Sequence, residues 1–152
     1  TGHLLFSTLH TNRAPAAITR LIDMGVEKFL ISSSLLAVLA QRLVRKLCPD
    51  CKCEDNSEYS YSLFNIDKSK TIYKAYGCKF CNFTGYKGRI AIGELFIIDD
   101  HIKELLKGEV DDNTLMKLAL SNGMISLDKQ LKTMLENTQT SIDEAIRIGI
   151  KE

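Results

Sequence analysis

Cys48-Pro49-Asp50-Cys51 is followed, after 26 intervening residues, by Cys78-Lys79-Phe80-Cys81. Each stretch is a C-x2-C motif, in which a tight turn lets two thiolates face the same point. Two such motifs complete a tetrahedron of sulfurs around Zn²⁺, and this spacing is typical of structural zinc sites. We therefore predict that Cys48, Cys51, Cys78 and Cys81 bind one structural zinc ion. The alternative is a pair of unrelated clusters of reduced cysteines.

Cys53 is the fifth cysteine of the chain. It lies two residues beyond Cys51 and could replace that ligand only if the turn changed, so we interpret it as a free thiol. The odd number of cysteines and the absence of a signal peptide favour a reducing cytoplasm. In that compartment the same spacing indicates metal binding rather than disulfides.

The composition sets limits on function without naming one. A chain of 152 residues with 45% hydrophobic side chains is typical of a globular protein with one or two small cores. Twenty basic residues against nineteen acidic ones leave a net charge of +1. No large basic field therefore indicates nucleic acid, and no acidic tail indicates a basic partner. No apolar run is long enough to predict a membrane span.

The chain opens without a methionine, at Thr1-Gly2-His3, and continues directly into Leu4-Leu5-Phe6. This short apolar run is typical of a β-strand. A lone strand cannot satisfy its own backbone hydrogen bonds, so we expect its sheet partners to lie in the upstream part of a larger protein. In this chain alone the run should pair with a neighbouring chain, lie disordered or stay exposed as an apolar patch.

Helical periodicity follows this run. We predict a first helix capped by Asn12, with Pro15 in its first turn, that ends at Gly25. Apolar residues then keep the i, i+3, i+4 spacing, which predicts a second helix over residues 26–47 that runs into the first cysteine. The basic residues near the end of that helix either face a ligand or complement the helix dipole.

Residues 54–77 are polar and rich in tyrosine, and we interpret them as an excursion folded around the metal. A strand is predicted over residues 90–98. The remainder should be helical, with three short helices capped by aspartate or serine and a final turn or two. The predicted caps are Asp99 or Asp100, Asp111, Ser126 and Ser141, and Glu144 should complete a capping box with Ser141.

The stretch from Gly2 to Asn12 closely resembles the histidine box of GspE/PilB-type ATPases, which power type II secretion, type IV pilus assembly and DNA uptake. The resemblance covers nearly the whole chain, and the tetracysteine motif points to the assembly and secretion branch. Two positions depart from the family pattern: Arg13 replaces a small or acidic residue, and Asn137 replaces a glycine. Further matching segments, in order, are Ala17–Leu21, Asp23–Gly25, Leu39–Arg45, Thr84–Arg89, Gly93–Leu95 and Gly123–Leu127.

This resemblance implies an α/β fold that is mostly α-helical. Residues 1–47 would be the C-terminal part of a RecA-like P-loop ATPase core, residues 48–88 a zinc-binding subdomain and residues 89–152 a helical C-terminal region. The whole protein would be a homo-hexamer that couples ATP hydrolysis to pilus or pseudopilus assembly. It would work at the cytoplasmic face of the inner membrane, with inner-membrane platform components as partners and without direct contact to nucleic acid.

The resemblance also implies roles for individual side chains. His10, with His3 in support, would bond the γ-phosphate or hold the attacking water, although a histidine at a strand end is more often structural. Inter-subunit or nucleotide contacts are implied for Arg20, Arg42 and Arg45. This chain contains no G-x4-G-K-[ST] motif, so ATP and Mg²⁺ would bind only in the full-length protein, and the isolated chain should be inactive.

Other classes of protein fit the residues less well. An autonomous zinc ribbon that binds a partner or nucleic acid should carry basic and stacking residues around the metal, whereas residues 54–67 include four acidic side chains. A catalytic zinc site needs an open coordination position, which four thiolates close. A thiol redox module would use a single C-x-x-C in a thioredoxin-like setting, and metal content separates it from the zinc site.

Overall fold

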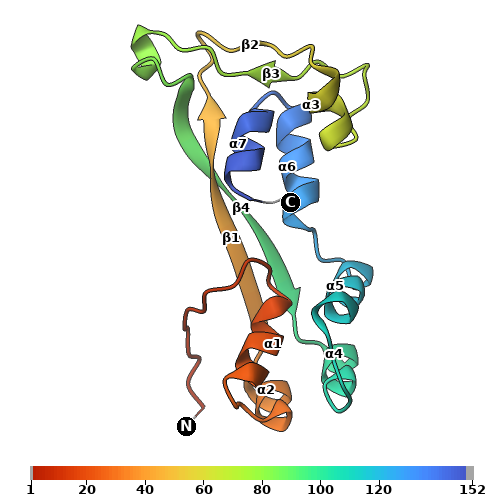
Figure 1. The fold of residues 1–152 in the computed structure, drawn as a ribbon. Helices are drawn as coiled ribbons and strands as arrows, with labels where there is room; N and C mark the ends of the chain where they lie inside the picture. The colour runs from red at the N-terminus through yellow and green to blue at the C-terminus, as the bar shows by residue number, and fades with distance from the viewer. Residues whose placement is uncertain (1, 150–152) are drawn as a thin grey trace. The chain divides into compact units, whose positions relative to one another are not determined.

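The computed structural model describes residues 2–149. They form seven α-helices, one short 3-10 helix and four strands, which pair as two two-stranded sheets, β1 with β4 and β2 with β3 (Figure 1). The described chain divides into two compact units. The first comprises residues 2–40 and 94–125, and the second comprises residues 41–93 and 126–149. This small fold of helices and strands agrees with the predicted α/β class, whereas the RecA-like core stays a prediction.

The first unit has a hydrophobic core of its own. Its helices are α1 (Ala16–Asp23), α2 (Lys28–Ser34), α4 (Asp100–Leu105) and α5 (Asp112–Ser121). They pack with residues from one end of each long strand, β1 (Ala37–Leu47) and β4 (Tyr86–Ile97). The buried residues of this core are Ala14, Ile18, Ile31, Ala40, Phe96, Ile98, Ile102, Leu106, Leu115, Ala119 and Met124.

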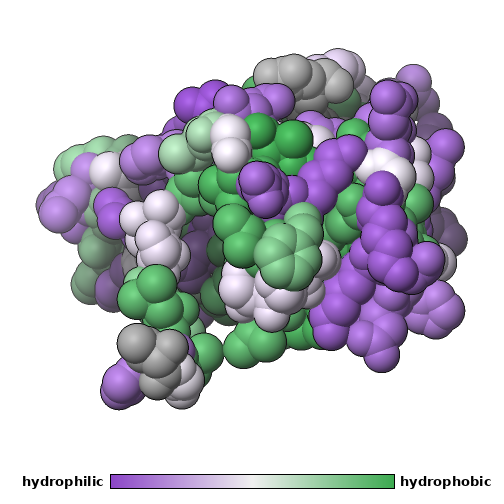
Figure 2. Space-filling model, turned by 90° about the horizontal axis from the view of Figure 1, so that it is seen from below, coloured by the Kyte–Doolittle hydropathy of each residue, from purple (hydrophilic) through white to green (hydrophobic). Residues whose placement is uncertain are grey.

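The predicted N-terminal strand does not form in this chain. Residues 2–11 belong to no helix or strand. Leu4, Leu5 and Phe6 are 67%, 85% and 87% exposed, so an apolar patch is left uncovered as expected. Hydrophobic side chains also reach the surface elsewhere (Figure 2). Phe29 of α2 is 69% exposed. An unpaired strand has no partner for its backbone groups, which explains why the apolar run alone did not produce one.

The first helix begins later than its sequence predicts. Asn12 is not the N-cap, because α1 starts at Ala16 with Pro15 before it and no capping side chain. Instead, the carboxylate of Glu94 accepts the backbone N–H of Ala14 at 2.7 Å and reaches this helix end from another part of the sequence. The end of the helix is as predicted, since Gly25 has a φ of +87° and its N–H bonds to the carbonyl of Ile22.

The prediction of a second helix over residues 26–47 is wrong beyond the first two turns. Helix α2 ends at Ser34, and residues 37–47 form strand β1. Three consecutive serines explain the end, because the hydroxyls of Ser32, Ser33 and Ser34 bond back to carbonyls three or four residues earlier. The apolar residues of β1 do not alternate with polar ones, because its polar residues occur as the pairs Gln41-Arg42 and Arg45-Lys46. Pairing with β4, and not a local pattern, makes this segment a strand.

The second unit, which contains the four cysteines, has a hydrophobic core of its own. Helices α3 (Glu58–Leu63), α6 (Leu127–Glu136) and α7 (Ile142–Arg147) belong to it. The short strands β2 (Cys53–Glu54) and β3 (Tyr73–Lys74) pair antiparallel. Its buried residues are Val44, Phe64, Ile66, Ile72, Ile92, Leu127, Leu131, Met134, Leu135, Ile142 and Ala145. The polar excursion therefore contributes a helix and three core side chains, Phe64, Ile66 and Ile72, which its composition did not indicate.

The predicted caps of the later helices are largely confirmed. The side chains of Asp99, Asp111, Ser126 and Ser141 accept backbone N–H groups at the starts of α4, α5, α6 and α7. The predicted capping box at Ser141 is only half formed: Ser141 caps the helix, but Glu144 does not bond back to it. The carboxylate of Glu144 does not turn back to Ser141, because it bonds to the side chains of Arg45 and Arg147 and to the backbone N–H of Arg45.

Within residues 2–149, no helix has the length and hydrophobicity needed to cross a membrane.

Candidate metal centre and family

The first cysteine pair lies directly after β1. Cys48 follows the last residue of the strand, and its N–H bonds to the carbonyl of Gly85 at 2.9 Å. The carbonyl of Cys48 then accepts the N–H groups of Cys51 and Lys52 at 3.4 and 3.1 Å. This turn brings the two cysteine side chains to the same side, as the C-x2-C spacing predicted.

The second cysteine pair frames a single turn of 3-10 helix, η1 (Lys79–Cys81). Two glycines make close backbone approach possible around it. A Cβ at Gly77 would lie 2.7 Å from the carbonyl oxygen of Phe83, and a Cβ at Gly85 would lie 2.5 Å from the Cβ of Ala75. Both glycines also have positive φ angles, +113° and +77°. The tight backbone of this pair therefore depends on glycine at both positions.

The four sulfurs form one cluster. The ligand atoms of Cys48, Cys51, Cys78 and Cys81 all lie within 4.8 Å of one another. The sulfur–sulfur distances are 4.0 Å for Cys48–Cys78, 3.8 Å for Cys51–Cys81 and 3.8 Å for Cys78–Cys81. A tetrahedral zinc ion with Zn–S bonds of about 2.3 Å requires sulfurs about 3.8 Å apart. The residues and their geometry therefore fit a closed tetrathiolate site.

Backbone N–H groups surround the sulfurs. Gly77 donates to the sulfur of Cys51 at 3.3 Å, and both Cys78 and Gly85 donate to the sulfur of Cys81 at 3.2 Å. Burial raises the pKa of the Cys51 thiol to about 12. Burial acts in the same direction on Cys81, but hydrogen bonds to its sulfur outweigh it and lower the pKa to about 6. The Cys81 thiol is thus readily deprotonated. A bound cation would stabilise the thiolates of the other three cysteines.

Cys53 does not belong to the cluster. It lies in β2, paired in register with Lys74, and its sulfur is 4.0 Å from the carbonyl oxygen of that residue. Its exclusion agrees with the prediction that it is a free thiol.

Contacts around the metal cluster link it to the C-terminal helices. The ammonium of Lys52 donates to the hydroxyl and the carbonyl of Thr138 at 2.7 and 3.1 Å, and it lies 4.7 Å from the ring centre of Tyr73. The N–H of Leu47 bonds to the carbonyl of Gln139 at 2.8 Å. These bonds fasten the first cysteine turn to the loop between α6 and α7. No local pattern indicated a role for Lys52, because its partner Thr138 is 86 residues away in the sequence.

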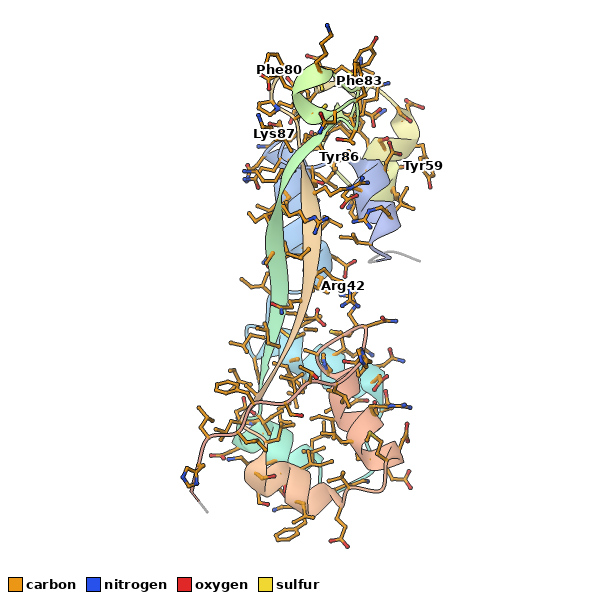
Figure 3. The ribbon with its side chains drawn as sticks, turned by 90° about the vertical axis from the view of Figure 1, so that its left-hand side faces the viewer. Arg42, Tyr59, Phe80, Phe83, Tyr86 and Lys87 are labelled. Atoms are coloured by element: carbon orange, nitrogen blue, oxygen red, sulfur yellow. The ribbon has the colours of Figure 1, made fainter. Side chains whose placement is uncertain are left out.

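The histidines and arginines singled out in the sequence lie in different parts of the fold. His3 and His10 are exposed in the irregular segment before α1, in the first unit. Arg20 is exposed on α1 in the same unit. Arg42, labelled in Figure 3, and Arg45 lie on β1 in the second unit. The structure brings Arg45 together with Arg89 and Arg147 around one pocket.

Glu94 and Glu144 are two buried carboxylates whose roles the sequence analysis missed. Glu94 is 0% exposed and meets Arg13 at 3.4 Å as well as the N–H of Ala14. A signal was present, because Glu94 lies two residues from both Ile92 and Phe96, and residues at this spacing share the buried face of a strand. Glu144 is also 0% exposed, and its ion pairs with Arg45 and Arg147 are 2.7 and 2.6 Å long.

Comparison with known protein families accounts for the combination of a tetracysteine cluster and a histidine-containing N-terminal segment. A family model described as "Type II/IV secretion system protein" matches residues 1–147. The chain belongs to this family. The resemblance seen in its motifs is thereby confirmed.

Curated members of the type II/IV secretion family match along the same length. The "Type II secretion system ATPase E" of Vibrio cholerae is 47% identical over 97% of the chain, and the "Type II secretion system protein E" of Pseudomonas aeruginosa is 44% identical over 100% of it. The "Type IV pilus assembly ATPase TfpB" of Acinetobacter baylyi is 42% identical over 97% of the chain. The chain spans 30%, 31% and 26% of these relatives, which is less than a third of their length.

Proposed function

We propose that this chain is the C-terminal portion of a motor ATPase that couples ATP hydrolysis to pilus or pseudopilus assembly in a secretion, pilus or DNA-uptake machine. The observation that carries the proposal is the family match over residues 1–147, together with relatives at 42% and 47% identity whose names are those of secretion and pilus assembly ATPases. The complete motor is a homo-hexamer with inner-membrane platform components as partners. It works at the cytoplasmic face of the inner membrane.

The same proposal divides the chain into three parts. Residues 1–47 end a RecA-like ATPase core, residues 48–88 form a zinc-binding subdomain, and residues 89–152 form a helical C-terminal region. The exposure of Leu4, Leu5 and Phe6 supports a core that continues upstream, because a sheet beside this run would cover those side chains and pair its backbone.

Zinc has a structural role in this proposal. Four cysteine ligands leave no open coordination position for a substrate, so the metal holds the chain rather than reacting. The chain's own residues already arrange the sulfurs close to tetrahedral spacing, through the turn at Cys48 and the glycines at 77 and 85. When bound, zinc would join β1 to the start of β4 and close the loop between the two cysteine pairs.

The nucleotide site is shared with the rest of the protein. His10, with His3 in support, contacts the γ-phosphate or the attacking water, and ATP and Mg²⁺ are held mainly by a glycine-rich loop outside this chain. The exposure of both imidazoles leaves them accessible to such a ligand. Arg20 is equally accessible for an inter-subunit contact, as an exposed side chain on α1. Arg42 and Arg45 are proposed for the same class of contact on the resemblance alone.

Direct nucleic-acid binding is not part of the proposal. The excursion beside the zinc motif carries the exposed carboxylates of Glu54, Glu58 and Asp67, which oppose a phosphate backbone. The fourth carboxylate, Asp55, is buried and bonds to Ser60.

The decisive experiment compares the full-length protein with residues 1–152 in an assay of Mg²⁺-dependent phosphate release from ATP. The full-length protein should hydrolyse ATP, whereas residues 1–152 should show no hydrolysis and at best millimolar nucleotide affinity. Hydrolysis by residues 1–152 alone, or none by an assembled full-length hexamer, would contradict the proposal.

A further inference from the structure

An open pocket of about 430 Å³ in the second unit is lined mainly by arginines. Its four lining residues are Leu43, Arg45, Arg89 and Arg147. Strand β1 supplies the first two, β4 supplies Arg89, and α7 supplies Arg147. Guanidinium groups offer planar forks of N–H donors that match the oxygens of phosphate and carboxylate. Three of them around one opening therefore make this pocket a candidate anion site.

Two of the guanidinium groups are fixed by one buried carboxylate. The Nε atoms of Arg45 and Arg147 donate to Oε2 of Glu144 at 2.7 and 2.6 Å, and Glu144 is fully buried. Arg45 is also held from another side, because its guanidinium lies 4.1 Å from the ring centre of Tyr86. Both donor groups are thus oriented by the protein before any ligand arrives, which lowers the entropic cost of binding.

Donors and positive charge remain after these contacts. Among residues 2–149, none accepts a hydrogen bond from Nη1 of Arg45 or Arg147. Arg89 is exposed and adds a third guanidinium at the pocket. Three cations against the single carboxylate of Glu144 leave a charge of +2 in this cluster. The charge is opposite to that of a doubly charged oxyanion.

We propose that this pocket binds the phosphate group of a phosphate monoester. Such a group carries between about −1.5 and −2 charges at neutral pH and presents three acceptor oxygens, whereas a carboxylate carries only −1. Leu43, 57% exposed, supplies an apolar wall for the organic part of the ligand. The residues that line the pocket all lie in the second unit, whereas His10 lies in the first.

Isothermal titration of the 152-residue chain with phenyl phosphate tests the site. Arg89→Gln removes a guanidinium that no described contact requires for folding, so circular dichroism should be unchanged. The affinity for phenyl phosphate should fall about tenfold, the scale of losing one charge-assisted hydrogen-bonding group. The affinity of Arg89→Lys for phenyl phosphate should fall less. The matched control is Arg20→Gln, which changes an exposed arginine of the other unit and should bind phenyl phosphate as the parent does. Unchanged affinity in Arg89→Gln, or no binding by the parent chain, would overturn the proposal.

Two further binding experiments identify the chemistry of the bound anionic group and the kind of molecule that carries it. Phenylacetate presents a carboxylate on a similar ring, and equal affinity for it would overturn the assignment to phosphate. Phosphate monoesters occur in solution and as lipid headgroups, so co-sedimentation with vesicles of phosphatidylcholine and phosphatidate separates the two. Binding to these vesicles that Arg89→Gln abolishes assigns the site to a headgroup, whereas phenyl phosphate binding without vesicle binding assigns it to a soluble ester.

Discussion

The carboxylate of Glu94 accepts the backbone N–H of Ala14 at 2.7 Å, although the two residues are 80 positions apart in the sequence. Its second oxygen meets the guanidinium of Arg13 at 3.4 Å. Glu94 is fully buried, so its oxygens need hydrogen-bond partners within the protein. The bond fixes the backbone four residues after His10 and thereby anchors the end of the histidine segment to β4.

Loss of this anchor should destabilise the first unit. In Glu94→Ala the buried N–H of Ala14 loses its acceptor, which should lower the free energy of unfolding by about 1–3 kcal/mol in urea titrations. Glu94→Gln keeps an acceptor oxygen, so its free energy of unfolding should fall less. Glu109→Ala, an exposed carboxylate of the same unit, serves as control. Equal stability of Glu94→Ala and this control would show that the bond contributes nothing.

Removal of one zinc ligand should loosen the second unit selectively. The parent chain, purified without chelator, should contain about one zinc per chain, and Cys78→Ser should lose it. New protease cleavage should then appear within residues 54–77, while α1 and α2 stay resistant because their core does not include the metal site. Elemental analysis and limited proteolysis measure both effects. The control Cys53→Ser should keep its zinc, and a parent chain reproducibly free of zinc would refute the metal site.

The ion pairs of Glu144 should make stability depend on acid. Burial alone would raise the pKa of Glu144, but hydrogen bonds from Arg147 and Arg45 outweigh it and lower the pKa from 4.5 to about 2. Because the folded pKa is below the unfolded one, the stabilisation is fully present above pH 4.5 and is lost as the pH falls toward 2. Solvent screens the partly exposed arginines, so we expect the ion pairs to contribute about 2 kcal/mol to the free energy of unfolding.

Glu144→Gln measures this contribution. The difference in unfolding free energy between parent and variant should be constant above pH 4.5 and shrink below it. Glu58→Gln removes an exposed carboxylate paired with Lys68 and serves as the control. A parent profile that runs parallel to Glu144→Gln at all pH values would show that the ion pairs do not shift this titration.

His10→Ala tests the proposed catalytic role in the full-length protein. Turnover of ATP should fall about a hundredfold or more, the usual scale for removing one preorganised donor from a transition state. ATP affinity should change little, because most phosphate contacts lie elsewhere. His101→Ala, an exposed histidine of α4, is the matched control and should retain turnover. If His10→Ala bound ATP weakly and melted early, the residue would be structural instead.

Several features were determined by the sequence because their causes are local. The C-x2-C spacing sets the geometry of each cysteine turn within a few residues. The caps at Asp99, Asp111 and Ser126 act on N–H groups three residues ahead, so their pattern could be recognised without the fold. The family resemblance likewise rested on contiguous motifs.

Other features were decided by tertiary structure because their causes are distant. Residues 37–47 keep the apolar spacing of a helix, and only pairing with β4 makes them a strand. Asn12 satisfied the local rule for an N-cap, but a carboxylate from β4 reached the start of α1 instead. Glu144 likewise satisfied the local rule for a capping box, yet Arg45 and Arg147 took its oxygens. A charged side chain buried beside two guanidinium groups gains more from them than from one backbone N–H, and no local pattern reveals which partners the fold will supply.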